Sequence, residues 1–222
     1  MRRVRCSVEK IGYAAMLFGL GLWLASSSSA WAGLPTDQLK TSVDRVIRLL
    51  EDPTLKTDAK VKERRAAIRK EAENILDFQE TAKRALGPHW QRISEREQQE
   101  FVSLFSDLLE HAYISKIERY TGEKITYTGE AGDGDLVTVK TRFITKQGTE
   151  IPIDYRMLRR ADRWLAYDVV IEGVSLVANY RVQFDKIVRT ASYADLVTRM
   201  KNKAGEFGAP GEVKRRESTP RS

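Results

Sequence analysis

Four residues of the chain have side chains that could take part in acid–base or nucleophilic chemistry. Asp168 and Glu172 stand four residues apart, and paired carboxylates can act as general acid and general base. Ser175 follows them, and together with His111 and Asp168 it supplies the residue types of a catalytic triad. No Gly-x-Ser-x-Gly elbow surrounds Ser175, however. The run Glu172–Ser175 is also typical of a turn that enters a helix, with Ser175 as cap and Glu172 accepting amide hydrogen bonds near the helix N-terminus. We interpret these residues as structural.

The N-terminal segment has the three parts of a secretory signal peptide. A positive region with three arginines and a lysine in the first ten residues precedes an apolar run at residues 11–25. A serine-rich spacer follows, and Ala30-Trp31-Ala32 fits the small-x-small pattern of a cleavage site. The apolar run is shorter than the roughly 20 residues that a membrane-spanning helix needs. We therefore predict that residues 1–32 are a signal peptide, which is removed from the mature protein.

Cysteine and charge content narrow the possible functions. Cys6 is the only cysteine and lies inside the predicted signal peptide, so the mature chain has no thiol for a disulfide or a metal site. The chain has 38 Lys and Arg against 31 Asp and Glu, and without the signal peptide 34 against 30. These charges are interspersed, whereas a nucleic-acid-binding protein concentrates its basic residues on one face. We predict no metal, no other cofactor and no nucleic-acid partner.

Helical periodicity dominates the first half of the chain. Apolar residues recur every three or four positions, and Pro53 and Gly122 end the first and the last of these segments. Ser94 and Glu97 form a capping box at the start of the longest one, whose apolar stripe is wide and rich in large side chains. The predicted helices cover residues 37–50, 60–77, 80–86 and 94–121.

The second half begins with alternating apolar and polar residues, the period of a half-buried β-strand. Three predicted strands have one apolar face, at 125–127, 137–143 and 151–157, and a fourth, Trp164–Ile171, is apolar at both parities and should be buried on both faces. Helical periodicity returns from Leu176 to Met200. The chain is predicted to be α+β, with an antiparallel sheet of about four strands covered by N- and C-terminal helices. Residues 33–204 would form one domain, and residues 205–222 a disordered tail.

Two segments of the chain resemble the MlaC family, also called the toluene-tolerance family, of periplasmic phospholipid carriers. One is Trp164–Arg181, in which a strand passes through a Glu-Gly corner into an amphipathic helix. The other is Ala85–Trp90, followed by the helix Glu97–Phe105 and by Tyr113. The hopanoid-associated HpnM proteins are similar in the same places, so that subgroup stays open.

The resemblance implies a non-enzymatic periplasmic carrier with phospholipid as its cargo. Such a carrier shuttles lipid between an outer-membrane lipoprotein complex and an inner-membrane ABC transporter complex with substrate-receiving subunits. Periodicity alone fits a filled core as well as a lined cavity, but the resemblance favours an apolar cavity that buries the acyl chains. The predicted lining residues are Phe105, Leu108, Tyr113, Val139, Phe143, Ile153, Tyr155, Val169, Tyr180 and Phe184. A secreted enzyme with a helix-capped curved sheet and a structural protein with a filled core are the alternatives.

Docking on the receiving subunits is expected to use exposed positive charge, which mainly sets encounter rate and register. Arginines gather near the predicted sheet turns and helix ends. They are Arg142, Arg156, Arg159, Arg160, Arg163 and Arg181.

Overall fold

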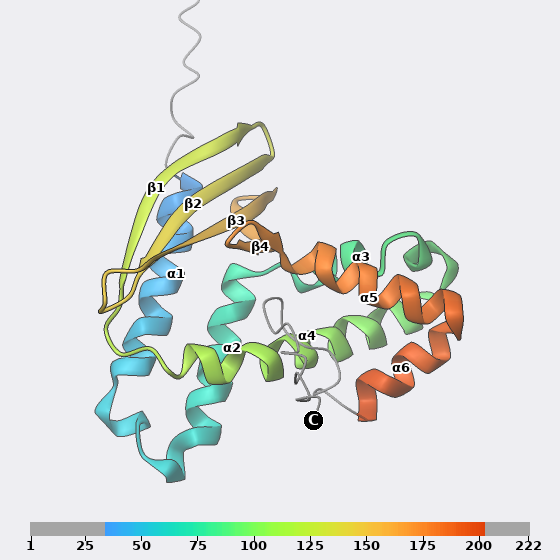
Figure 1. The fold of residues 1–222 in the computed structure, drawn as a ribbon, viewed down its shortest axis with the longest axis horizontal. Helices are drawn as coiled ribbons and strands as arrows, with labels where there is room; N and C mark the ends of the chain where they lie inside the picture. The colour runs from blue at the N-terminus through green and yellow to red at the C-terminus, as the bar shows by residue number, and fades with distance from the viewer. Residues whose placement is uncertain (1–33, 203–222) are drawn as a thin grey trace, which may run out of the picture. The chain divides into compact units, whose positions relative to one another are not determined.

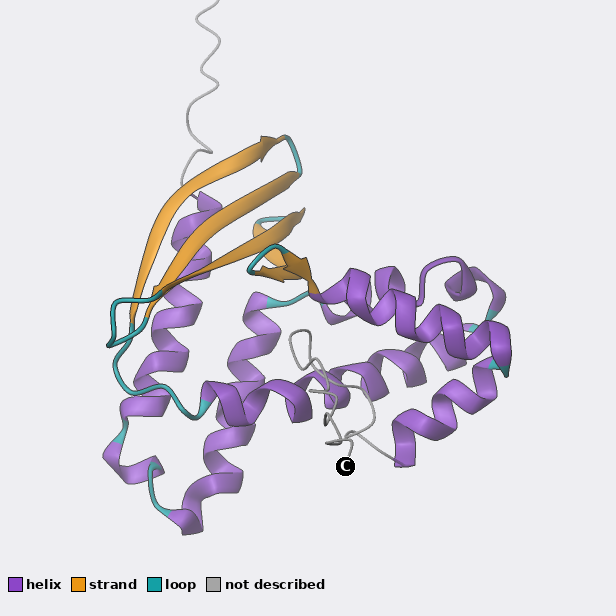
Figure 2. Cartoon of the chain, viewed as in Figure 1, coloured by secondary structure: helices purple, strands orange, loops and turns teal. Residues whose placement is uncertain are grey.

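The computed structural model describes residues 34–202 (Figure 1). The predicted signal peptide at 1–32 and the predicted tail at 205–222 lie outside this range. Within it the chain is α+β, as predicted, with helices before and after a single antiparallel sheet (Figure 2).

Local sequence signals set several helix ends in the N-terminal half. The first long helix stops just before Pro53, which cannot donate a backbone hydrogen bond. The capping box of the longest helix is confirmed: the Ser94 side chain accepts from the Glu97 amide, and Glu97 accepts from the Ser94 amide. The elements are α1 (Leu34–Glu51), the 3₁₀ helices η1 (Pro53–Leu55) and η2 (Asp58–Lys60), α2 (Val61–Ile75), α3 (Phe78–Leu86), the 3₁₀ helix η3 (Gly87–Arg92) and α4 (Glu95–Ile117).

Two helices end earlier than their periodicity predicts. α2 stops at Ile75 because Leu76 becomes extended and forms an isolated bridge with Ala166. α4 stops at Ile117 rather than at Gly122, and the next residues turn into the first strand. Tertiary contact with the sheet decides the first of these ends.

The sheet has the strand order β1-β2-β3-β4-β5, and each neighbouring pair is antiparallel. The two-residue β5 was not predicted, and it pairs with the end of β4 across a turn at Glu172 and Gly173. Both turn residues have positive φ, 50° and 81°, as a type I′ hairpin requires. Glu172 is therefore a hairpin residue, and its predicted role near the helix N-terminus is wrong. The strands are β1 (Lys124–Asp133), β2 (Leu136–Ile144), β3 (Glu150–Arg160), β4 (Arg163–Ile171) and β5 (Val174–Ser175).

A bulge in β4 explains why this strand is apolar at both parities. Tyr155 pairs with Val169, but Met157 pairs with Ala166, so β4 carries one extra residue between these pairs. Before the bulge, the even-numbered residues of β4, such as Ala166, face the inner side of the sheet. After the bulge, the odd-numbered residues, such as Val169, face that side. Trp164, ahead of the bulge, is 4% exposed, which confirms its predicted burial.

Two closing helices complete the fold. The Ser175 hydroxyl accepts the Ala178 amide at 3.0 Å, which confirms its predicted role as helix cap. No helix within residues 34–202 is both long enough and apolar enough to cross a membrane. The closing helices are α5 (Leu176–Thr190) and α6 (Tyr193–Asn202).

Buried side chains of the described residues form three clusters. The largest joins α3, the first half of α4, α5 and α6, and contains four stacked or edge-on aromatic rings. The second packs α1 against the sheet around Leu39, Met157 and Trp164. The third joins α1, α2 and α4 through Leu50, Ile68 and Ile114. The space bounded by these clusters is the candidate site.

Candidate functional site: an apolar cavity between sheet and helices

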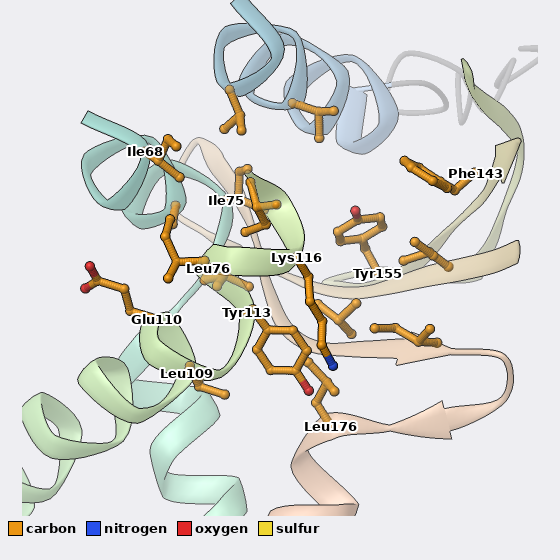
Figure 3. A pocket seen from close by; sticks show the side chains of 18 of the residues that line it. Ile68, Ile75, Leu76, Leu109, Glu110, Tyr113, Lys116, Phe143, Tyr155 and Leu176 are labelled. Atoms are coloured by element: carbon orange, nitrogen blue, oxygen red, sulfur yellow. The ribbon is translucent and has the colours of Figure 1, made fainter. Parts of the chain in front are cut away.

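A cavity of about 660 Å³ lies between the inner face of the sheet and helices α1, α2 and α4 (Figure 3). Its lining is mainly aliphatic and aromatic. α1 contributes Val43, Val46, Ile47 and Leu50; α2 contributes Ile68, Ala72 and Ile75; the strands contribute Ile125, Phe143, Ile151, Ile153, Tyr155, Val169 and Ile171; and α4 contributes Phe105, Leu109, Tyr113, Ile114 and Ile117.

Strand register places the sheet's contribution on one face. Thr141, Ile153 and Ile171 lie opposite one another across β2, β3 and β4, and paired positions share a face of the sheet. Phe143 and Ile151 form the next such pair toward the strand ends. These side chains are half-buried, apart from the buried Thr141. In a filled core they would be covered, so their residual accessibility reflects the cavity itself.

Six of the predicted lining residues meet in this cavity. They come from α4 and from the three consecutive strands β2, β3 and β4. They are Phe105, Tyr113, Phe143, Ile153, Tyr155 and Val169.

The four other predicted residues lie outside the cavity, in packed regions. Tyr180 and Phe184 of α5 place their rings edge-on to Phe105, with centroids 5.1 Å and 5.4 Å away. Leu108 belongs to the same helical cluster. Val139 is fully buried in the cluster between α1 and the sheet. The prediction of these four as cavity residues is wrong because the apolar stripe of α4 continues past the cavity into a filled core, and α1 covers part of the sheet.

Sequence reasoning missed the contribution of α1 and α2. The signal was present, since both helices have apolar stripes at helical spacing. Such a stripe predicts burial, but it does not say whether the opposing surface is in contact with it or a cavity's width away.

Asp168 is the most enclosed charged group of the lining, with 3% of its surface exposed. Its carboxylate accepts hydrogen bonds from Arg156 Nη1 at 3.1 Å, Ser175 Oγ at 2.6 Å and the Val177 amide at 3.0 Å. It thus holds the N-terminus of α5 against β3 and β4. His111 is exposed on α4. Within residues 34–202 no contact joins His111 to Asp168 or to Ser175. The arrangement is that of a helix cap rather than a triad.

Burial shifts the pKa of two tyrosines of the cavity wall, Tyr155 and Tyr120. Burial raises the pKa of Tyr155 to about 12. Burial also raises the pKa of Tyr120, with smaller contributions from the charges of Glu51 and Glu123. Both shifts disfavour the charged form of these two phenols.

A partly buried ionic contact joins the two helices beside the cavity. Glu118, just after α4, accepts from Arg64 Nη2 at 2.8 Å and from Arg65 Nη2 at 2.7 Å, both on α2. The hydrogen bonds from Arg65, then those from Arg64, lower the pKa of Glu118. The separation of α2 and α4, and with it the cavity width, depends partly on this contact.

The six arginines predicted to dock on a partner protein each bind another group of this chain. Four bind carboxylates: Glu150 for Arg142, Asp168 for Arg156, Asp135 for Arg159, and Asp77 and Glu80 for Arg160. Arg163 donates to Asn74, and Arg181 donates to the Arg84 carbonyl. Their side chains have structural roles, which any charge-reversal experiment at these sites must separate from docking.

An antiparallel sheet with helices around an apolar cavity of this volume defines a class of protein suited to enclosing an apolar ligand. A family model described as "MlaC protein" matches residues 40–202. The chain therefore belongs to the MlaC family, as the sequence resemblance predicted.

The known proteins that are similar to the chain include one from Haemophilus influenzae and one from Ralstonia solanacearum. The intermembrane phospholipid transport system binding protein MlaC of Haemophilus influenzae is 22% identical over 147 residues, which span 64% of this chain and 69% of the relative. A phospholipid-binding protein from Ralstonia solanacearum, solved in complex with a phospholipid, has a TM-score of 0.67. At 24% identity that match covers 77% of this chain and 97% of the other, and it shows the shared fold.

Proposed function

We propose that this chain is a periplasmic phospholipid carrier that buries acyl chains in the cavity between its sheet and helices. The observation that carries the proposal is the apolar cavity itself, walled by strands and helices from both halves of the chain. The named functions of the relatives from Haemophilus influenzae and Ralstonia solanacearum support phospholipid as the cargo.

The energetics of transport explain why a carrier needs such a cavity. A two-chain lipid has on the order of 30 methylenes, each worth about 0.8 kcal/mol on transfer from water to an apolar site. The gross cost of exposing both chains is thus above roughly 20 kcal/mol. If a methylene occupies about the 30 Å³ of a water molecule, a cavity of about 660 Å³ holds on the order of 20 of them. That is about two thirds of the methylenes in the acyl chains of a two-chain lipid.

The polar groups of the site fit binding rather than catalysis. Asp168, the buried carboxylate of the lining, is used by Arg156, Ser175 and the α5 N-terminus. The proposal therefore includes no reaction on the lipid. The proposed partners of the carrier are an outer-membrane lipoprotein complex and an inner-membrane ABC transporter complex with substrate-receiving subunits.

Native mass spectrometry of the exported, purified protein tests the proposal. The expected result is a protein mass with one bound phospholipid, which collisional activation releases intact. The matched control is Ile153→Trp, which narrows the cavity and should lower the lipid-bound fraction without unfolding the protein. A bare protein mass after mild purification, together with no lipid uptake from micelles, would contradict the proposal. A bound hopanoid-type lipid would instead place the chain with the hopanoid-associated carriers.

A further inference from the structure

Where α2 faces α4, part of the cavity wall is made of ion pairs. Nη1 of Arg69, on α2, contacts Glu110 and lies 2.7 Å from Asp107, and both carboxylates are on α4. Arg69 and Glu110 line the cavity, whereas Asp107 does not line it and is 56% exposed. Figure 3 shows Glu110 pointing away from Tyr155 and the sheet. The Arg69 side chain therefore reaches from the cavity lining to the protein surface.

Apolar packing across the same boundary is sparse. Of the described residues, only Leu50, Ile68 and Ile114 are buried in the cluster that joins α1 and α2 to α4. The cluster that holds α3, α4, α5 and α6 together contains thirteen buried side chains. Ionic contacts therefore make up a large part of what holds α2 against α4.

The sheet holds the other ends of α1 and α2. Leu39 of α1 packs into the cluster around Trp164, and Leu76, just after α2, forms a bridge with Ala166. The Asp77 amide donates to the Ala166 carbonyl at 2.9 Å. The remaining ends of the two helices are joined to each other through η1 and η2. We call α1 and α2 together the flap, since the pair is fixed to the sheet at one end.

We infer that acyl chains enter and leave the cavity between α2 and α4, when the flap swings away from α4 about its sheet end. The inference rests on the proposed function and adds to it the route of the cargo. Exposed ion pairs stabilise the closed position only weakly, so they can open and close repeatedly. A boundary made of apolar side chains would expose them to water at each opening, which is unfavourable.

A simpler explanation is that the Arg69 ion pairs only stabilise helix packing. Lys201 of α6 forms an ion pair of that kind with Glu100 of α4, at 2.6 Å. Their side chains are 50% and 40% exposed, and neither residue lines the cavity. This pair joins another helix to α4 without bounding the cavity, so it supplies the matched control.

A reducible crosslink between α2 and α4 tests the route. Cys6 is the only cysteine and lies in the predicted signal peptide, so the introduced thiols of the exported Arg69→Cys, Glu110→Cys protein are its only ones. The protein is loaded with pyrene-labelled phosphatidylethanolamine and then joined by a bismaleimide with a disulfide spacer. Fluorescence follows lipid transfer to phosphatidylcholine vesicles. Transfer should stop in the crosslinked protein and resume on reduction. The same crosslink between Glu100→Cys and Lys201→Cys should leave the rate unchanged.

A single substitution tests the ion pairs without a crosslink. Arg69→Gln should raise the rates of lipid loading and lipid release by the same factor, about twofold to fivefold, the range of an exposed ion pair. The equilibrium affinity for lipid should not change, because the closed protein has these ion pairs with and without cargo. Lys201→Gln should change neither rate. Transfer by the wild-type protein should become faster as ionic strength rises, because salt screens exposed charges.

The possible outcomes separate the route from the carrier function. If the protein crosslinked at positions 69 and 110 transfers lipid at the wild-type rate, the route is wrong and the carrier function stands. An Arg69→Gln protein with unchanged rates, or with a changed affinity, would also overturn the inference, because Arg69 would then serve packing or touch the cargo. If the wild-type protein takes up no labelled lipid, both proposals fail.

Discussion

Val139 and Ile153 have similar side chains on the same face of the sheet, but their surroundings differ. Val139 is fully buried between β2 and α1, and Ile153 faces the cavity. A larger residue must therefore displace packed neighbours at the first position, whereas it enters open space at the second.

This difference predicts opposite results for the same substitution. Val139→Trp should lower the free energy of unfolding by about 3 kcal/mol, because overpacking forces strained rotamers. For a domain of this size that corresponds to a Tm lowered by roughly 10 °C. Ile153→Trp should keep its Tm within about 3 °C but lose most of its bound lipid. Thermal melts and native mass spectra of both variants provide the check. Equal behaviour of the two variants would mean that the cavity is not where the structure places it.

Asp168 is predicted to stabilise the fold and to take no part in any reaction on the lipid. Asp168→Ala should cost about 3 kcal/mol, since it removes a buried carboxylate and leaves the Val177 amide and the Ser175 hydroxyl without their acceptor. Ser175→Ala should cost only about 1 kcal/mol, the usual value of a helix cap. Urea denaturation of both variants measures the difference. A loss at Ser175 as large as that at Asp168 would argue against the carboxylate as the centre of this network.

At the scale of secondary-structure elements, the contact between α2 and α4 should make stability depend on pH. The arginines lower the folded-state pKa of Glu118, so its stabilising effect is fully present above the unfolded pKa of about 4.3. It is lost as pH falls through the folded pKa. Glu118→Gln should therefore lower stability by about 2 kcal/mol at pH 7 and flatten the acid limb of the stability curve.

Glu63→Gln is the control for this experiment. Glu63 lies on α2, next to Arg64, and pairs with Lys60, but its side chain is 58% exposed. An exposed pair contributes little, so its curve should follow that of the wild-type protein. The measurement is the denaturant midpoint of the wild-type protein and both variants between pH 3 and 7. If Glu118→Gln keeps the wild-type loss of stability at acid pH, the contact does not have this role.

At the scale of the whole molecule, bound lipid should raise the free energy of unfolding. A ligand that binds only the folded state adds about 2.7 kcal/mol when present at 100 times its Kd. Delipidation should therefore lower the Tm by several degrees, and added phospholipid should restore it. The Ile153→Trp protein, with its cavity narrowed, should show a much smaller shift. An identical Tm with and without lipid, at saturating lipid, would contradict a cargo held in the cavity.

The sequence by itself determined the features that depend on neighbouring residues. Helix and strand periods, the capping box at Ser94 and the cap at Ser175 are local, and the structure has each of them. The α+β order and the burial of Trp164 follow from the same patterns. Family membership also followed, because two sequence segments carry it.

Only the tertiary structure decided which apolar residues line a cavity and which fill a core. The stripe of α4 reads the same at Phe105, Leu108 and Tyr113, although Leu108 is packed and Tyr113 faces open space. The β4 bulge, which reverses the parity of that strand, also depends on its pairing with β3. The physical reason is that a filled core and a cavity need the same apolar side chains. They differ in the distance to the opposite wall, which elements remote in the sequence set.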